Sequence, residues 1–186
     1  MSDTLGVQGQ ARSMTTETTT AATARTWKLG EFSVNRLALA ELREAGLIRE
    51  LGISNVGAEH LAEAQAIAPV VCVQNQYGLT ARREDDELVR ICAEQGVAFV
   101  PFFAVASGVA GGAVYRRVEA IAAAHGVTPA QVRLAWTLHQ GPNVLAIPGT
   151  GDPAHVAENL AAGALRLTEA QVAELSSIAR SPIEEP

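Results

Sequence analysis

The sequence has few lysines, few aromatic residues, few cysteines and no long apolar run. Its 14 basic residues include a single lysine, Lys28, and the net charge is −6. A surface that binds duplex nucleic acid needs clustered lysine and arginine side chains, so nucleic acid is not an expected partner. No apolar run approaches the ~18–20 residues that span a bilayer, so a membrane is not expected to be a partner either.

The two cysteines, Cys72 and Cys92, do not have the spacing of a metal site. We therefore expect reduced thiols, no bound metal and a cytoplasmic location. The threonine-rich start, residues 1–26, lacks the apolar core of a signal peptide. It is expected to be a disordered polar leader, with either Met1 or Met14 as the first residue.

Hydrophobic residues make up 48% of the 186, enough for one globular domain over residues 27–186. Apolar runs of strand length alternate there with amphipathic runs of helix length. Strands are expected at 46–54, 70–76, 97–105 and 144–149, and helices at 58–68, 84–96, 113–126, 128–140, 153–163 and 169–180. This alternation predicts an α/β fold with parallel strands, but it does not distinguish an open sheet from part of a barrel.

Two details of the pattern are more specific. The strand at 97–105 is apolar almost throughout, which is typical of a parallel strand covered on both faces. Two helix starts carry a capping box, Thr128 with Gln131 and Thr168 with Gln171, in which each side chain caps the other's backbone.

Five segments carry recognisable motifs. They are LGISN (51–55), VQNQY (73–77), VPFF (100–103), TPAQVRLAW (128–136) and IPGTGDPAHVAEN (147–159). In this order and spacing they resemble the C-terminal half of the aldo/keto reductase family, whose members are NADP(H)-dependent (β/α)₈ barrels. The resemblance covers residues 41–178, and WKLGEFSVNRLAL (27–39) also resembles the first strand of that barrel.

The resemblance implies an internal truncation near residue 40, where three further strands and their helices would stand. A barrel of this kind takes about 250 residues or more, and residues 27–186 number only 160. We therefore expect an incomplete (β/α)₈ TIM barrel with about five parallel strands. Five strands do not close an eight-stranded barrel, so a homodimer or a partner protein is expected to cover the open side.

The family's catalytic aspartate, tyrosine, lysine and histidine are implied to lie in the missing segment. Lys28 precedes the first strand, and neither Tyr77 nor Tyr115 has a lysine nearby in the sequence. A tyrosine with a pKa near 10 is a poor proton donor at neutral pH without such a neighbour. Classical carbonyl reduction by this chain alone is not expected, and the catalytic residues are unknown, with Tyr77 as the candidate.

The resemblance also implies a set of cofactor residues. Ser54 and Asn55 match the pair that holds the nicotinamide carboxamide, and Gln74 matches the glutamine that joins them. Phe102 takes the place of an aromatic ring against the nicotinamide. Read without the resemblance, Ser54 and Asn55 are helix-capping residues after a strand, and Phe102 is part of the core.

In the motif at 147–159, Gly149, Thr150, His155, Glu158 and Asn159 match the frame that binds the adenosine 2′-phosphate and the adenine. Gly149 replaces the usual basic residue and His155 the usual arginine. A neutral imidazole does not replace a bidentate guanidinium on a phosphate. The resemblance implies NADP(H) as the cofactor, and these two replacements leave NAD(H) as an alternative.

Three functions follow from these patterns. The first is an oxidoreductase-family protein that binds a nicotinamide cofactor and acts on an unknown small molecule. The second is a lyase, cyclase or isomerase that uses the former substrate pocket without a cofactor, with Tyr77, His155 and Glu158 as acid–base groups. The third is a non-catalytic subunit.

Overall fold

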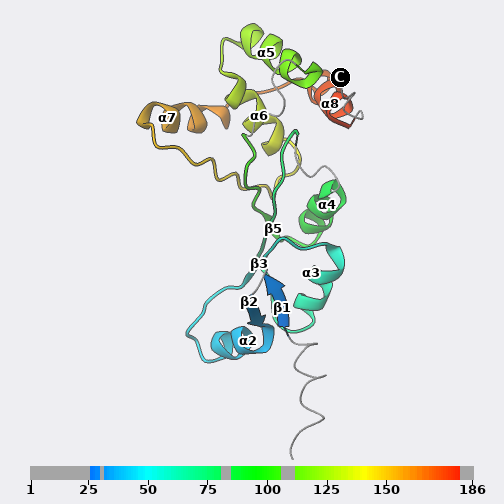
Figure 1. Ribbon diagram of the computed structural model, residues 1–186, viewed down its shortest axis with the longest axis vertical. Coiled ribbons are helices and arrows are strands. Elements are labelled where there is room, and N and C mark those ends of the chain that lie inside the picture. The colour runs from blue at the N-terminus through cyan, green and yellow to red at the C-terminus, as the bar shows by residue number, and fades with distance from the viewer. Residues whose placement is uncertain (1–25, 30–31, 81–84, 106–111, 181–186) are drawn as a thin grey trace, which may run out of the picture.

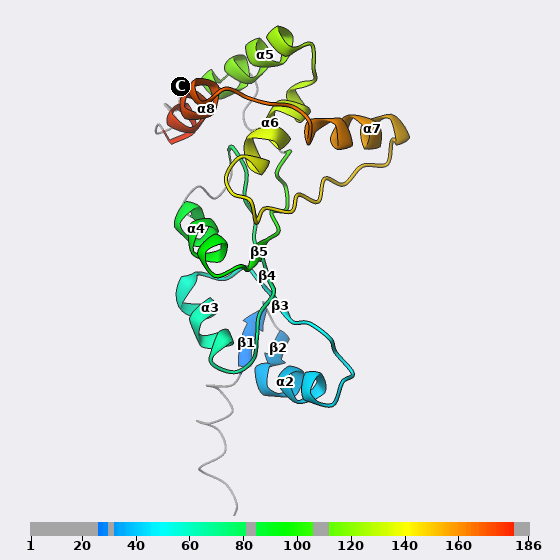
Figure 2. The same cartoon turned by 180° about the vertical axis from the view of Figure 1, so that it is seen from behind.

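The fold is known from a computed structural model, which describes residues 26–29, 32–80, 85–105 and 112–180 (Figure 1). Apart from Thr26, the expected leader at 1–26 lies outside these ranges. The chain is elongated, with the parallel strands in the middle and helices α5, α6 and α8 gathered at one end (Figures 1 and 2). Within the described residues, no helix is both long enough and apolar enough to span a membrane.

The centre of the fold is a parallel sheet in the order β3 (Gly52–Ser54), β4 (Cys72–Gln74) and β5 (Ala98–Phe99). In one row, Ile53 pairs with Val73 and Val73 pairs with Phe99. A parallel bridge from Phe99 to Val144 continues this row to a fourth strand position. The expected parallel α/β arrangement is thus present.

Among the described residues, one face of this sheet is buried and the other is only half-buried. The paired residues Ile53, Val73, Phe99 and Val144 are all buried, whereas their neighbours Cys72, Ala98 and Val100 are only half-buried. Helices α3 and α4 lie on one side of the strands (Figures 1 and 2). The expectation that the strand at 97–105 is covered on both faces is wrong, because the other face would point into the interior of a barrel that is open here.

The N-terminal segment differs from the expected first barrel strand at 27–39. Strands β1 (Thr26–Leu29) and β2 (Phe32–Asn35) form a separate antiparallel pair, and α2 (Arg36–Glu44) follows directly. The five strands of the described residues are therefore three parallel and two antiparallel, instead of about five parallel.

All four expected strands are shorter than predicted, and β4 and β5 keep only Cys72–Gln74 of the run 70–76 and Ala98–Phe99 of the run 97–105. Only Gly52–Ser54 of the run 46–54 is strand, and Leu47 in its first half is 75% exposed. In the run 144–149 only Val144 makes a bridge, and Leu145 donates its backbone N–H to the carbonyl oxygen of Phe99 at 2.9 Å. The alternation of apolar residues predicted both strands, but a strand also needs a neighbour along its whole length.

The helices follow the predicted pattern closely. They are α3 (Ala58–Gln65), α4 (Asp86–Glu94), α5 (Ala113–His125), α6 (Pro129–Leu138), α7 (Pro153–Ala162) and α8 (Glu169–Arg180). Both predicted capping boxes are present. Gln131 donates its backbone N–H to the Thr128 hydroxyl, and Gln171 does the same to the Thr168 hydroxyl.

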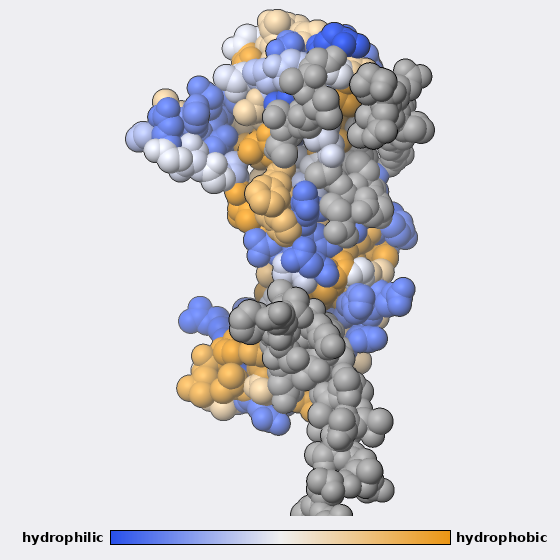
Figure 3. Space-filling view, viewed as in Figure 1, coloured by the Kyte–Doolittle hydropathy of each residue, from blue (hydrophilic) through white to orange (hydrophobic). Residues whose placement is uncertain are grey.

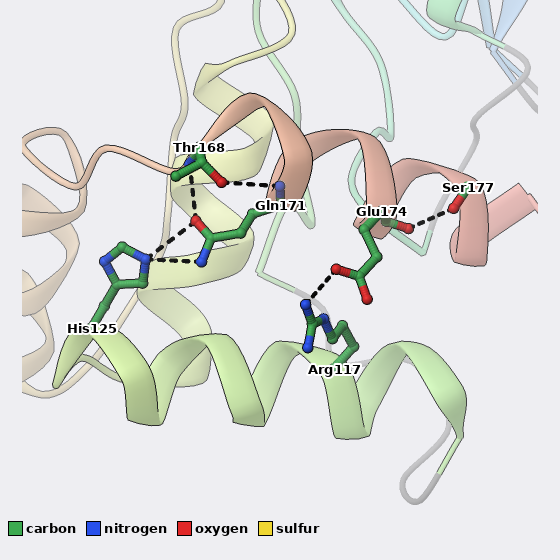
Figure 4. Close-up of polar contacts among 6 residues, drawn as sticks. All are labelled: Arg117, His125, Thr168, Gln171, Glu174 and Ser177. Carbon is green, nitrogen blue, oxygen red and sulfur yellow. Dashed lines mark hydrogen bonds and ion pairs between the residues drawn. The ribbon is translucent and has the colours of Figure 1, made fainter.

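Helices α5 and α8 are joined by polar contacts along their length (Figure 4). Arg117 forms an ion pair with Glu174, and the ring of His125 lies within 3.3 Å of the Gln171 side-chain oxygen. Beneath them, Trp136 on α6 is fully buried and donates its ring N–H to the Ser176 hydroxyl at 3.1 Å. The same indole ring stacks on Tyr77, which links this helical end to the sheet.

Candidate functional site

Three predicted residues meet where β3 and β4 end. The Ser54 hydroxyl donates to the main-chain oxygen of Gln74 at 2.7 Å, and the Asn55 side-chain amide donates to the Ser54 oxygen at 3.1 Å. The backbone N–H of Asn55 also donates to the Gln74 oxygen at 3.1 Å. The carboxyl ends of parallel strands are where barrel proteins build their sites. The structure therefore brings together the predicted serine, asparagine and glutamine.

The backbone of Asn55 has an unusual conformation. Its φ is 55°, in the left-handed region that asparagine tolerates better than most residues. The turn that follows is held by Asn75, whose side chain accepts from the Val56 N–H at 3.1 Å and donates to the Val56 oxygen at 2.8 Å. The exposed side chain of Asn55 is thus presented at the strand ends by a fixed backbone.

Asn75 is a supporting residue that the sequence reading missed. It is 1% exposed, and its amide also donates to the carboxylate of Asp85 at 2.9 Å, just before α4. The sequence gives one signal for it: Asn75 is a polar residue directly after β4, at a position expected to face the core. One buried amide therefore joins the turn after β3 to the start of α4.

Phe102 lies beside this cluster on the next strand position. Its backbone N–H donates to the Asn75 oxygen at 3.0 Å, and a parallel bridge pairs it with Gln76. Its half-buried ring meets the ring of Phe103 at 5.3 Å, edge to face. Phe103 is 66% exposed and has a φ of 59°, so the chain turns sharply there. An aromatic surface therefore adjoins the polar cluster.

The second predicted group surrounds the start of α7. Asp152 caps this helix by accepting from the Ala154 N–H at 2.9 Å, and the Thr150 hydroxyl accepts from the Asp152 N–H at 3.1 Å. The exposed His155 ring lies 3.2 Å from the same hydroxyl. Gly149 is exposed beside them. Thr150, Asp152 and His155 thus form one hydrogen-bonded group at the start of α7.

Glu158 and Asn159, further along α7, are half-buried, and the Glu158 main-chain oxygen accepts from the Gln131 amide at 3.0 Å. This contact docks α7 on α6. Helix α7 stands well apart from β3 and β4, at the end of an extended segment (Figure 1). The structure thus keeps the predicted residues as two groups, one at the strand ends and one at α7.

Neither described tyrosine is placed as a proton donor. Tyr77 is 1% exposed, packs against Phe99 and Trp136, and donates its hydroxyl to Asp86 at 2.6 Å. On α5, a hydrogen bond to the Glu119 carboxylate raises the pKa of Tyr115, which makes it a weaker acid. Tyr77, the candidate from the sequence, is a core residue in this structure.

A general model of the aldo/keto reductase family matches residues 31–180, which is more than half of the chain. The chain belongs to the aldo/keto reductase family. Pyridoxine 4-dehydrogenase of Escherichia coli (strain K12) is 42% identical over 154 residues, which is 81% of this chain and 52% of that protein. The family recognised in the sequence is confirmed.

Solved structures agree with this assignment. A thermostable aldo-keto reductase in complex with the inhibitor epalrestat is 37% identical, with a TM-score of 0.70 over 76% of this chain and 52% of that one. An aldo/keto reductase from Klebsiella pneumoniae in complex with NADP and acetate is 26% identical, with a TM-score of 0.66 over 80% and 54%. The chain spans about half the length of these relatives, and its fold is a partial TIM barrel.

Proposed function

We propose that this chain binds a nicotinamide dinucleotide, with the nicotinamide at the ends of β3 and β4 and the adenosine end at the start of α7. The observation that carries the proposal is the hydrogen-bonded cluster of Ser54, Asn55 and Gln74. Support also comes from the Klebsiella pneumoniae relative, whose structure holds NADP. NADP(H) is the proposed cofactor, and NAD(H) is the alternative.

The polar cluster suits a carboxamide. Asn55 donates one amide hydrogen to Ser54, which leaves a second N–H and a carbonyl oxygen for a ligand. The Ser54 hydroxyl gives its hydrogen to the Gln74 backbone, so its oxygen acts as an acceptor. The side-chain amide of Gln74, which is half-buried, provides a further donor and acceptor. These groups orient the ring while Phe102 offers it an apolar surface.

The start of α7 has fewer groups suited to the adenosine end of the cofactor than the polar cluster has for the nicotinamide. The Thr150 hydroxyl and the backbone N–H groups of the first turn can bind an anion. However, Asp152 already accepts one of those N–H groups and brings a negative charge to the helix start. Gly149 and His155 stand where a stronger cation is usual in the family. We therefore infer that a 2′-phosphate is held mainly by neutral groups, so NADPH and NADH should differ little in affinity.

When bound, the cofactor supplies or accepts a hydride. The chain's own contribution is to bind and orient, because Tyr77 is buried against Asp86 and the pKa of Tyr115 is raised. The proton that accompanies a hydride has no suitable donor among these tyrosines. We propose that the chain retains cofactor binding, and that it does not by itself perform the classical carbonyl reduction of its family.

The test is a titration of NADPH and NADH followed by the melting temperature. Ligand at a hundredfold excess over its Kd stabilises a protein by about 2.7 kcal/mol, or roughly 5–11 °C in a chain of this size. We expect such a shift in the wild type and a smaller one in Asn55→Gly, which removes the amide but tolerates the positive φ. Gln65→Ala on α3 is the control and should behave like the wild type.

The two alternatives are distinguished by the same titration. If neither cofactor moves the melting temperature at millimolar concentration, the cofactor proposal is wrong. The chain is then a cofactor-free enzyme or a non-catalytic subunit.

A further inference from the structure

The parallel sheet presents four strand positions in a row. They are β3, β4, β5 and the segment that begins at Val144, joined to β5 by its bridge with Phe99. Among the residues that the structure describes, β1 pairs only with β2, so no strand is paired to the outer side of β3 or of the Val144 segment. The row therefore has two open edges, and all of its strands run in the same direction.

Both edges have backbone groups that point outward. Leu51 and Asn55 bond to β4, so by alternation the backbone of Gly52 and Ser54 faces away from the sheet. On the other edge, the backbone N–H of Phe99 donates to the main-chain oxygen of Asn143, and the backbone N–H of Leu145 donates to the main-chain oxygen of Phe99, at 2.9 Å each. In an extended chain this alternation would turn the backbone of Ala146 outward. Each edge thus offers donors and acceptors to a further parallel strand.

The same edges lack the usual protections. Natural sheets discourage edge pairing with charged side chains or proline. The β3 edge reads LGIS and the other reads VLAI, without a charge in either, and a proline comes only at Pro148. Leu145 is 58% exposed and Ile147 is 48% exposed, and an extended chain would place both on the face opposite the buried Val144. Hydrophobic patches also interrupt the hydrophilic surface on the face shown in Figure 3.

We propose that a second copy of this chain pairs with both edges and that two copies close one eight-stranded barrel. Four strand positions from each copy give eight, the number at which a parallel barrel has an interior just filled by side chains. A twofold axis along the barrel keeps every strand parallel, and it sets the β3 edge of one copy against the Ala146 edge of the other. Two copies use up both edges, so the assembly stops at a dimer.

The barrel completed in this way also completes the site. Ser54 and Gln74 belong to the row that faces the open interior, and Leu145 of the second copy would stand beside β3 on that same face. The apolar side chains of Leu145 and Ile147 would then wall the pocket in which the polar cluster lies. Each of the two pockets is incomplete without the other copy.

The first experiment measures the mass of the chain by sedimentation equilibrium over a range of micromolar concentrations, without cofactor. We expect about 39 kDa, twice the 19.5 kDa of one chain. Ala146→Pro removes the outward N–H of the edge and leaves the bonds to β5 in place, so self-association should weaken about tenfold or more. Ala146→Val keeps the N–H and serves as the matched control, with circular dichroism to verify that both variants fold.

A second variant keeps the test valid if Ala146→Pro does not fold. Ile147→Asp places a charge on the interior face and should give a monomer, whereas Ile67→Asp after α3 should leave the dimer intact. Hydrogen exchange at Ala146 should slow as the dimer forms. A stable monomer at all concentrations, a dimer unaffected by both edge variants, or a dimer with rapid exchange at Ala146 would overturn the proposal. None of these outcomes depends on cofactor binding.

Discussion

The hydroxyl of Ser54 donates a 2.7 Å hydrogen bond to the main-chain oxygen of Gln74, across the pairing of β3 with β4. This bond ties the side chain that begins the polar cluster to the neighbouring strand. It also fixes the direction of the Ser54 lone pairs, one of which accepts from Asn55. The orientation of the candidate site therefore depends on a contact between residues 20 positions apart.

Ser54→Ala should remove this orientation at a small cost in stability. We expect a loss of about 1 kcal/mol, the usual value of one partly buried hydrogen bond, together with roughly three- to tenfold weaker NADPH binding. Urea denaturation and calorimetric titration measure the two effects. Ser54→Thr keeps the hydroxyl and should restore most of the affinity. An unchanged affinity in Ser54→Ala would place the nicotinamide elsewhere.

Asn75→Ala should be far more destabilising. The side chain is 1% exposed and forms hydrogen bonds with the backbone N–H and the main-chain oxygen of Val56 and with the carboxylate of Asp85. Its removal leaves buried groups unpaired, so we expect a loss of about 2–4 kcal/mol in the free energy of unfolding. Urea denaturation should place Gln65→Ala, the less buried amide control, within about 0.5 kcal/mol of the wild type. Equal effects from both variants would contradict the role given to Asn75.

Gly52 should not accept a side chain. A Cβ at this position would lie 2.4 Å from the Cys72 sulfur on the paired strand. We expect Gly52→Ala to cost about 1–3 kcal/mol through overpacking. In the double variant with Cys72→Ala the sulfur is gone, so the cost of the alanine should shrink. A double-mutant cycle by chemical denaturation measures this coupling, and additive effects would show that the sulfur is not the obstacle.

Cys92 should make the protein less stable at high pH. Burial raises the pKa of this thiol to about 11 from an ordinary 9.0. Between these two pH values the folded state keeps the proton that the unfolded state has lost, so the free energy of unfolding falls as pH rises. Below pH 9 the contribution is fully present. Denaturation curves from pH 8 to 11 should show a shallower decline in Cys92→Ala, and identical slopes would argue against a buried protonated thiol.

The helices could be predicted well because their signals are local. Thr128 with Gln131 and Thr168 with Gln171 act within one turn, and both capping boxes form where the sequence places them. The strands depend on distant partners. The run 46–54 has the alternation of a strand, but Leu47 is mostly exposed and only Gly52–Ser54 pairs with β4. The antiparallel pairing of β1 with β2 was missed because residues 27–39 were assigned by resemblance to a single strand of the barrel.

In the candidate site, too, some residues could be predicted from the sequence, and those that depend on distant contacts could not. Ser54, Asn55 and Gln74 were identified by resemblance to the family, and the structure brings them into contact. Asn75 and Gly52 were missed because their importance comes from contacts with Val56 and Cys72, about 20 positions away. Tyr77 was taken as a possible acid because sequence does not reveal burial. Contacts between elements, more than residue types, therefore decide which residues hold the site in place and which are free to contact a ligand.

The central claim is that the ends of β3 and β4 receive the nicotinamide. Saturation-transfer NMR with NADP⁺ tests it directly, because the nicotinamide and adenine protons give separate signals. The account predicts saturation of the nicotinamide protons in the wild type and its selective loss in Asn55→Gly, with the adenine signals retained. Saturation of the adenine alone in the wild type, or of neither ring, would contradict it.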